Sequence, residues 1–345
     1  MSAKPINLAL QGGGAHGAFT WGVLDALLES GAVEIVGVSA TSAGALNAAA
    51  LKAGLAAGGA SAARDNLDWL WGQVGALDDM RLAHWMTAFS PAPGLVSKTL
   101  EYSLPFSIAD AMSRLFSPYA YGPFYQNPLE RIVEHFDFAN IRTGAGPALF
   151  ICATNVRSGK IRVFRDEEIV PEAILASACL PTMFQAVEIP DKATGRVEAY
   201  WDGGYTGNPA LFPLFDADLP ADIVIVNINP LTRPDLPTTA PEILNRINEI
   251  SFNTSLLREL RAISFVQDLM ASGRIPEGAM KFSLVHMIAD DDLMRDLSVA
   301  TKLVPTPSVL AGLKASGRQA AKSFLDNHLE DIGERSSVDL PTMFG

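Results

Sequence analysis

Three short segments of this sequence combine glycine with serine or aspartate in a way that could carry chemistry. They are Gly12–Gly17 (GGGAHG), Ala40–Gly44 (ATSAG) and Asp202–Gly204 (DGG). A serine hydroxyl becomes a nucleophile when a base accepts its proton. A glycine-rich turn can also direct backbone N–H groups at a developing oxyanion. In this order the segments supply candidates for each part of an acyl-transfer site.

The glycine segment follows a short apolar run, Ile6–Leu10, and precedes helical spacing over Ala15–Leu28. This pattern predicts a buried strand, a glycine turn and a helix. The glycines also satisfy the G-x-G-x-x-G spacing of a dinucleotide site, which requires an acidic residue at the end of the second strand. Glu34 is at a suitable distance but begins that strand. The dinucleotide site is therefore the weaker interpretation, and an oxyanion-binding turn is the alternative.

Ser42 lies between the apolar run Glu34–Ser39 and an Ala-rich segment, 42–57, that we expect to be helical. A nucleophile elbow, G-x-S-x-G, needs small residues two positions before and two positions after its serine. Gly44 fits, and Ala40 replaces the first glycine, which makes a positive φ less favourable there. The alternative role for Ser42 is to cap the helix.

Asp202 follows the apolar run Ala199–Trp201 and precedes two glycines. An aspartate at the end of a strand could act as a general base or orient one. The alternative is an ordinary Asp-Gly turn.

Taken together and in this order, the three segments resemble the motifs of the patatin-like phospholipase family. Members carry a G-G-G-x-R/K-G loop, a G-x-S-x-G elbow and, well downstream, a D-G-G/A motif. The segment Ala176–Pro181 (ASACLP) is also similar to the family's A-S-x-A-x-P sequence. The resemblance covers roughly residues 5–230, and the C-terminal third resembles a bacterial subset of the family.

The resemblance implies a three-layer α/β/α fold around a mostly parallel sheet, which agrees with the two strand-turn-helix units in the first part of the chain. It also implies a Ser–Asp dyad without histidine, in which Ser42 is the nucleophile and Asp202 is the general base. The amides of Gly12, Gly13 and Gly14 would form the oxyanion hole, with Ala43 as a further donor.

His16 stands where the family has arginine or lysine. A histidine there would either order the loop and help to bind an anion, to an extent set by pH, or point to solvent. His286 and His328 are the histidines that a Ser-Asp-His triad of the α/β-hydrolase order would use. We expect both to be structural, because the D-G-G motif indicates a dyad.

Aromatic residues are concentrated in Arg81–Tyr125, which has nine in 45 positions against 8% in the whole chain. We therefore expect a catalytic domain over residues 1–235 with an inserted helical and aromatic cap at about 66–126. A mainly helical region, 236–345, would pack on it. Segment 81–125 could form a trough for acyl chains, a surface that contacts membrane, or an ordinary packed cap.

Composition excludes several classes of function. The net charge is −12 and no run of Lys and Arg occurs, which argues against nucleic-acid binding. No uncharged apolar run reaches the roughly 18 residues of a membrane-spanning helix; segment 42–63 comes nearest but is interrupted by Asn47 and Lys52. The N-terminus lacks the layout of a signal peptide. We expect a cytoplasmic protein, with peripheral membrane contact through segment 81–125. Cys152 and Cys179 lack metal-site spacing, and neither a metal nor a cofactor is expected.

These observations predict a serine acyl-ester hydrolase, with a phospholipase A-type activity on fatty acyl esters as the first choice through the family. Soluble esters, thioesters and polyester oligomers are the alternative substrates. A non-catalytic binding or dimerisation protein on the same fold is disfavoured, because Ser42, Asp202 and the loop glycines are all intact. A homodimer is compatible with the sequence.

Overall fold

The computed structural model describes residues 2–76, 117–192, 194–276, 278–297 and 299–344. In these residues the centre of the fold is an eight-stranded sheet in the order β5-β6-β3-β2-β1-β7-β8, with β4 paired to β3 off this path. The strands are β1 (Lys4–Leu10), β2 (Val33–Thr41), β3 (Ala148–Asn155), β4 (Ile161–Arg165), β5 (Val187–Asp191), β6 (Arg196–Asp202), β7 (Asp222–Val226) and β8 (Leu284–Ile288).

The middle of the sheet is parallel. Strand β1 pairs in parallel with β2 and β7, β2 with β3, and β7 with β8. The pairs β3–β4, β3–β6 and β5–β6 are antiparallel and form one side of the sheet. The predicted mostly parallel sheet is therefore confirmed.

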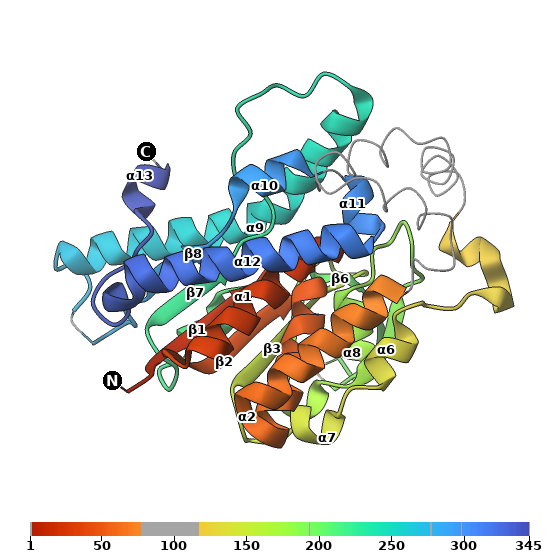
Figure 1. Ribbon diagram of the computed structural model, residues 1–345, viewed down its shortest axis with the longest axis horizontal. Coiled ribbons are helices and arrows are strands. Elements are labelled where there is room, and N and C mark those ends of the chain that lie inside the picture. The colour runs from red at the N-terminus through yellow and green to blue at the C-terminus, as the bar shows by residue number, and fades with distance from the viewer. Residues whose placement is uncertain (1, 77–116, 193, 277, 298, 345) are drawn as a thin grey trace.

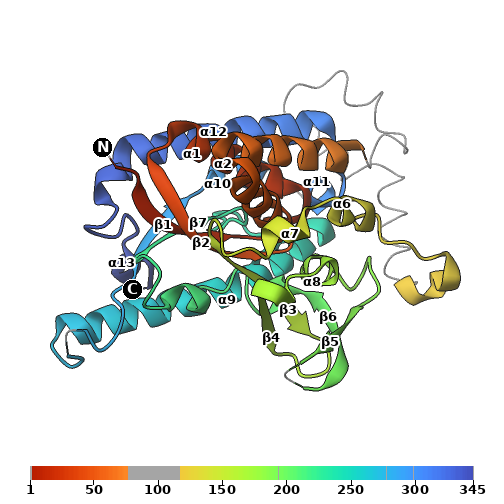
Figure 2. The same ribbon diagram turned by 90° about the horizontal axis from the view of Figure 1, so that it is seen from below.

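Alternate residues of the central strands enter two separate cores, one on each face. Leu8 of β1 and Val224 of β7 belong to one apolar cluster, whereas Ala9 and Ile223 belong to the other. Both strands are buried on both faces, as parallel strands covered by helices are. Helices α1 (Gly17–Ser30), α2 (Ala43–Ala76) and α12 (Pro307–His328) cover the first face, and α9 (Ala240–Ala271) covers the second (Figures 1 and 2). The three-layer α/β/α prediction is confirmed.

Helix α2 is much longer than the predicted helix over 42–57. Its axis bends where Gly58 and Gly59 depart from helical φ and ψ, and it continues to Ala76. Its second half buries Leu67, Leu70 and Trp71 in the main core. Residues 66–76, predicted to begin the cap, are therefore part of this core helix. Most of the remaining predicted cap, 77–116, lies outside the described residues.

The C-terminal region is mainly helical, as predicted, but it also supplies β8 to the sheet. Its helix α12 packs closely on α1. A Cβ on Gly22 would lie 2.0 Å from the Lys314 carbonyl oxygen, and one on Gly317 would lie 2.0 Å from the Phe19 carbonyl oxygen. Only glycine permits this separation of the two helices.

Shorter elements complete the description. The α-helices are α6 (Glu130–Glu134), α7 (Phe138–Ile141), α8 (Pro171–Ser177), α10 (Asp291–Asp296), α11 (Val299–Leu303) and α13 (Leu340–Phe344). The 3-10 helices are η1 (Gly14–His16), η2 (Pro118–Phe124), η3 (Asp166–Glu168), η4 (Gly203–Tyr205), η5 (Phe212–Phe215) and η6 (Leu329–Asp331). In the described part of the chain, no helix has the length and apolar character needed to cross a bilayer.

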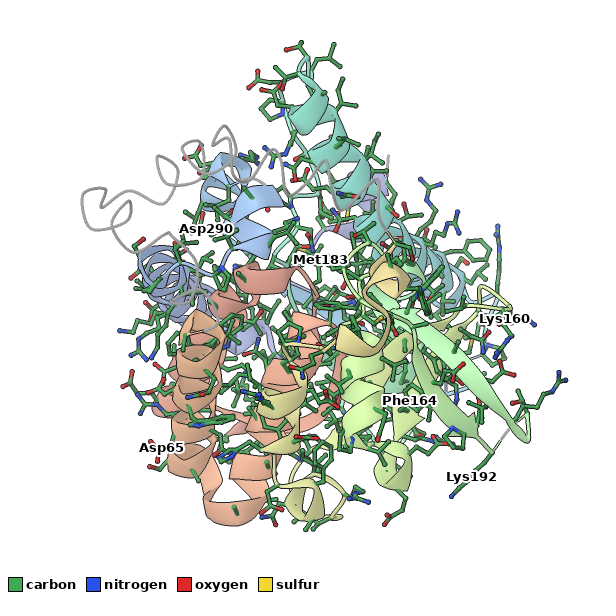
Figure 3. All side chains as sticks on the ribbon, turned by 90° about the vertical axis from the view of Figure 1, so that its right-hand side faces the viewer. Asp65, Lys160, Phe164, Met183, Lys192 and Asp290 are labelled. Atoms are coloured by element: carbon green, nitrogen blue, oxygen red, sulfur yellow. The ribbon has the colours of Figure 1, made fainter. Side chains whose placement is uncertain are left out.

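Side chains divide between surface and interior as the layers require. Asp65 on α2, Lys160 before β4 and Lys192 after β5 are exposed, whereas Phe164 of β4 is buried (Figure 3). Phe164 makes an edge-on contact with the fully buried ring of Tyr200.

Candidate active site

Strand β3 brings Ser42 and Asp202 to the same place. On the side of β3 opposite β4, Thr41 of β2 pairs with Cys152, and Asp202 of β6 pairs with the next residue, Ala153. The turn after each neighbouring strand therefore begins at the same level of the sheet. A Cβ on Gly203 would lie 2.2 Å from the Cys152 carbonyl oxygen and 3.0 Å from Thr41 Cγ2. Glycine at this position allows the two turns to meet.

The glycine loop lies against the same point from the other side of β2. Leu10 of β1 pairs with Ala40 of β2, so the loop that follows β1 lies beside the Ser42 turn. A Cβ on Gly12 would lie 2.6 Å from the Ser42 Cβ. All three sequence segments thus converge at the carboxyl ends of β1, β2 and β6.

Ser42 has a backbone conformation that L-residues rarely adopt. Its φ is 57°, and Asp166 is the one other non-glycine residue with a positive φ in the described chain. Such a conformation costs energy and persists where the surroundings enforce it. Here the Ser42 amide donates to Ser177 Oγ at 2.9 Å, and Ser177 Oγ donates to the Cys152 carbonyl at 2.6 Å. Ser177 belongs to the ASACLP segment, so the structure gives that motif a role in holding the elbow.

The two small positions of the elbow differ in how strictly they need glycine. A Cβ on Gly44 would lie 2.3 Å from the Leu10 carbonyl oxygen, so α2 can approach β1 only with glycine there. Ala40 is a buried residue of β2, and its φ is not positive. Alanine at position 40 therefore needs no unfavourable conformation, and the strain is at Ser42. In the described residues no α2 amide donates to Ser42 Oγ, so the capping role is not observed.

Asp202 is completely buried at the end of β6. Its Oδ1 accepts from the Gly204 amide at 2.8 Å, whereas its Oδ2 has no hydrogen-bond partner among the described residues. Burial raises the pKa of this carboxyl to about 7, against the opposing effects of the Ser42 hydroxyl and the Gly204 amide. The Ser42 side chain is thus close enough to act on Asp202, although no hydrogen bond of ordinary geometry joins it to Oδ2. A base with a free oxygen and a pKa near neutrality can accept a proton from a hydroxyl.

The amides predicted for the oxyanion hole are not equivalent. The Gly12 amide donates to Asn208 Oδ1 at 2.7 Å and is therefore already used. In the described part of the chain, the amides of Gly13, Gly14 and Ala43 make no hydrogen bond. The structure thus leaves three of the four predicted donors able to bind an oxyanion. Asn208, which the sequence analysis missed, stands just beyond the DGG motif in an Asn-Pro step that gave only a turn signal.

His16 is buried rather than directed to solvent. Its Nε2 lies 2.8 Å from Thr301 Oγ1 on α11. Burial holds its pKa well below the usual value, and the positive charges of Lys302 and Arg233 lower it further. A neutral imidazole can order the glycine loop, but it supplies no positive charge for an anion.

His286 and His328, the histidines considered for a triad, form hydrogen bonds with residues other than Ser42 and Asp202. His286 on β8 contacts Asp222 Oδ1 at 3.0 Å through Nε2 and Ser337 Oγ at 3.1 Å through Nδ1. His328 contacts Asp331 Oδ2 at 2.8 Å. These contacts suit structural histidines, which is the role expected from the sequence.

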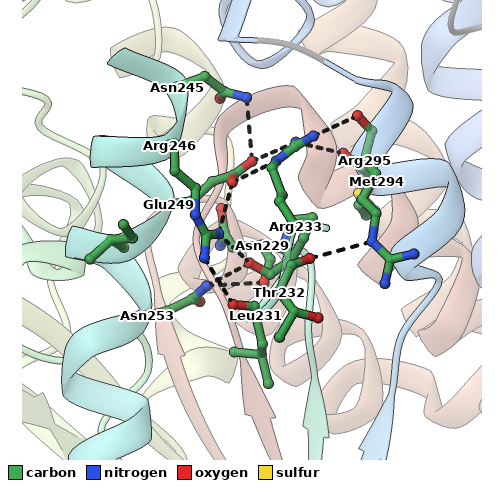
Figure 4. Close-up of polar contacts among 12 residues, drawn as sticks. Asn229, Leu231, Thr232, Arg233, Asn245, Arg246, Glu249, Asn253, Met294 and Arg295 are labelled. Atoms are coloured by element: carbon green, nitrogen blue, oxygen red, sulfur yellow. Dashed lines mark hydrogen bonds and ion pairs between the residues drawn. The ribbon is translucent and has the colours of Figure 1, made fainter. Parts of the chain in front are cut away.

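A polar network that sequence reasoning missed joins the segment after β7 to α9 and α10 (Figure 4). Arg233 donates to both carboxylate oxygens of Glu249 on α9, at 2.8 and 2.7 Å. Glu249 is buried, which raises its pKa, but Arg233 and the other nearby cations outweigh this and hold the pKa below its usual value. Lys302 donates to Asn229 Oδ1 at 3.0 Å, and Asn229 reaches the loop itself. The contacts join residues far apart in the chain, so no local pattern could have shown them.

Among the described residues, no group of three or more His, Cys, Asp or Glu side chains comes together as metal ligands would.

Comparison with known families decides the classification. The family described as "Patatin-like phospholipase" matches residues 8–217, which is more than half of the chain. The chain belongs to the patatin-like phospholipase family. Membership in this family supports a lipid-acting hydrolase and accounts for the spacing of the glycine loop, the serine elbow and the DGG motif.

Solved structures of other proteins show a weaker likeness. VipD from Legionella pneumophila is 15% identical with a TM-score of 0.43, over 94% of this chain and 67% of VipD. The type III effector ExoU is 17% identical with a TM-score of 0.34, over 96% of this chain and 54% of ExoU. A complex of SpcU with ExoU from the type III secretion system of Pseudomonas aeruginosa gives 15% identity and a TM-score of 0.32, over 93% of this chain and 53% of the other. No protein of curated function matches the sequence.

Proposed function

We propose that this patatin-like protein is a serine acyl-ester hydrolase that cleaves fatty acyl esters of lipids with a Ser42–Asp202 dyad. The observation that carries the proposal is that a strained serine and a buried aspartate meet where β2 and β6 end on the same side of β3. The serine is held at φ 57°, and the aspartate has a free oxygen and a pKa near 7. Neither feature is needed for a helix cap or a simple turn.

The first half of the reaction acylates the serine. Ionised Asp202 accepts the proton of Ser42 Oγ while that oxygen bonds to the carbonyl carbon of the ester. The carbonyl oxygen becomes an oxyanion, which the amides of Gly13 and Gly14, with Ala43, would bind. When the tetrahedral intermediate collapses, the bond to the leaving alkoxide breaks and Asp202 returns the proton to it.

The second half releases the fatty acid. Asp202 accepts a proton from water as the water oxygen bonds to the acyl carbon of the acyl-enzyme. The new oxyanion occupies the same amides. Collapse breaks the bond to Ser42 Oγ, which takes the proton back from Asp202. The carboxylic acid product then leaves, and the enzyme is restored.

The family supports a lipid ester as the substrate. Soluble esters, thioesters and polyester oligomers would use the same machinery, so chain-length preference separates them. Contact with a lipid surface through segment 81–125 belongs to the same proposal, although residues 81–116 lie outside the described part of the chain. Residues 117–125 of this segment are described. Among them, the Tyr119 side chain is 59% exposed, and its hydroxyl accepts a hydrogen bond from the Ala186 amide.

The decisive experiment treats the full chain with a fluorophosphonate probe and maps the labelled peptide. We expect the label on Ser42, none on Ser42→Ala, and a loss of kcat of about 10³-fold or more in Ser42→Ala and Asp202→Asn. Ser39→Ala is the matched control, because Ser39 is a buried serine of β2, the strand that leads to Ser42, and it donates to the Ala210 carbonyl. Labelling at another residue, or full activity in Ser42→Ala, would refute the proposal.

Phospholipid vesicles and soluble esters of graded acyl length then test the substrate class. A rate that rises with chain length supports a lipid substrate. A preference for short soluble esters would contradict the lipid assignment and leave the dyad intact.

A further inference from the structure

In the peptide that joins Gly12 and Gly13, the carbonyl group is hydrogen-bonded, and the N–H group is not, among the described residues. The Gly12 carbonyl oxygen accepts from Asn229 Nδ2 at 2.8 Å and from Asn208 Nδ2 at 3.4 Å. In a trans peptide the carbonyl and the following N–H point in opposite directions. The Gly13 N–H therefore points away from both asparagines, and it has no partner among the described residues. Fixing the carbonyl fixes the direction of a free amide.

Lys302 determines how the Asn229 side chain is oriented. Asn229 is buried, with 1% of its surface exposed, and its Oδ1 accepts from Lys302 Nζ at 3.0 Å. An ammonium group can only donate hydrogen bonds, so the carbonyl end of the Asn229 amide must face Lys302. The NH₂ end must then face the Gly12 carbonyl and Gln11 Oε1, the latter at 3.2 Å.

From these contacts we propose that Asn229 and Lys302 are positioning residues that aim and polarise the Gly13 amide of the oxyanion hole. The inference rests on the proposed hydrolase function. Lys302 withdraws electron density through the Asn229 amide and the Gly12 carbonyl, which makes the Gly13 N–H a stronger donor. Preorganised donors of this kind stabilise charge that develops in the transition state.

The surroundings of Lys302 support this role. Its carbonyl oxygen packs against Gly14, where a Cβ would lie 2.3 Å away, and the preceding residue, Thr301, contacts His16. Helix α11 therefore holds the loop at several points. Because His16 is buried and its pKa is well below the usual value, the charge that reaches the loop comes from Lys302 and not from His16.

The charged groups that face Lys302 set the pH range over which it acts. Burial, which has the largest effect, and the charge of Arg233 together lower its pKa to about 8, against the opposing effect of Glu249 on α9. His16 on η1 faces it as a neutral group. Lys302 therefore carries a positive charge at neutral pH and loses it as the pH rises through about 8.

Asn229→Asp tests the aim of the amide, since it replaces the NH₂ donor with an oxygen of the same shape. We expect kcat to fall by about 10- to 100-fold with KM nearly unchanged, because misplacing one group costs rate more than binding. Asn7→Asp is the matched control. Asn7 lies in the middle of β1, is fully buried and donates to the Pro220 carbonyl at 2.7 Å, away from the glycine loop. Its variant should lose similar stability and keep its kcat.

Lys302→Met and Lys302→Arg test the charge. The methionine variant should lose about 10-fold in kcat, and arginine, which keeps the charge and the donor, should restore most of it. The wild-type rate should decline as the pH rises through about 8. Lys302→Arg should not show this decline, because arginine stays protonated. A merely structural lysine would change Tm and leave both the kcat and the pH profile as they are.

The outcomes separate this inference from the proposed function. If the wild type fails to hydrolyse esters or to react with the probe at Ser42, the proposed function is wrong. If the wild type is active and labelled at Ser42, but Asn229→Asp and Lys302→Met keep wild-type kcat, only the positioning role is wrong. If Asn229→Asp does not fold, the kcat values and pH profiles of Lys302→Met and Lys302→Arg test the positioning role.

Discussion

Asp202 shows how burial can make a weak base useful. An exposed aspartate is ionised at neutral pH but holds a proton poorly, whereas the buried carboxyl here has a pKa of about 7. It can therefore take a proton from Ser42 and return it to a leaving group within one cycle. Its free Oδ2 is the atom that would do so, because Oδ1 is bound to the Gly204 amide.

The rate should follow the ionisation of this carboxyl. Only ionised Asp202 can accept the Ser42 proton, so kcat/KM on a soluble ester should rise about tenfold per pH unit below pH 7 and level off near it. A pH–rate profile at constant ionic strength measures this. A profile that stays flat from neutrality down to about pH 5 would contradict the role of Asp202 as base.

The same residue should make the folded protein less stable at high pH. Its pKa is 3.8 when unperturbed and about 7 when folded, so between these values the folded state binds more protons than the unfolded state. Stability then falls as the pH rises from about 4 to 7, and the loss persists above 7. Asp202→Asn removes this cost, so it should be inactive and more stable than the wild type above pH 7, by about 1–3 kcal/mol.

Urea unfolding at about pH 8 and about pH 4 measures the difference, which should shrink at the lower pH. Ser42→Ala serves as the control, because it removes the nucleophile and keeps the buried carboxyl. An Asp202→Asn variant that is less stable than the wild type at both pH values would show that the carboxylate stabilises the fold.

The elements were predictable where their sequence signals are local. The apolar run Ile6–Leu10 before the glycine loop predicted β1, and the apolar run Glu34–Ser39 before the serine turn predicted β2. The continuation of α2 to Ala76 was not predictable, because Gly58 and Gly59 look like a helix end. Only the burial of its second half against the main core shows why the chain resumes the helix.

The candidate site was predictable as a set of residues but not as a geometry. The turns indicate Ser42 and Asp202, yet their proximity depends on the register with which β2 and β6 pair with successive residues on one side of β3. The use of the Gly12 amide by Asn208 joins positions 196 residues apart. No local pattern encodes such a contact, so the sequence assigned the Gly12 amide to the oxyanion hole.

The close packing of α12 on α1 gives a prediction about the stability of the fold. Gly317→Ala places a Cβ about 2.0 Å from the Phe19 carbonyl oxygen, so the two helices must separate. We expect the free energy of unfolding to fall by about 1–3 kcal/mol, as in other overpacked cores. Gly72→Ala is the matched control, since this exposed α2 glycine has no atom within 4 Å of its added Cβ. The control should be neutral or slightly stabilising.

Chemical denaturation of the two variants measures the difference. Equal stability of Gly317→Ala and the wild type would mean that α12 does not press on α1 as the structure indicates.

The whole molecule is tied together across its sequence. Residues after 235 complete the main sheet through β8 and cover α1 through α12. Asp25 on α1, which is buried, is bound by Arg64 of α2 at 2.6 Å and also by Arg318 of α12. Separating these helices would leave the buried Asp25 carboxylate without a partner, which is strongly unfavourable. The ion pairs therefore hold α1, α2 and α12 together in addition to their apolar contacts.

The net charge gives a prediction for the whole molecule. With 38 acidic against 26 basic residues, the protein carries −12 and should be repelled by an anionic bilayer. Under the proposed lipid hydrolase function, vesicles of phosphatidylcholine should be hydrolysed faster at low salt than vesicles that also contain phosphatidylserine. Salt should reduce the difference, because the screening length falls from about 10 Å at 0.1 M to about 3 Å at 1 M. Fatty acid release from both kinds of vesicle, with a soluble ester as the control for salt effects on chemistry, measures this. Faster hydrolysis of the anionic vesicles at low salt would show that a local basic surface, not the net charge, governs contact with lipid.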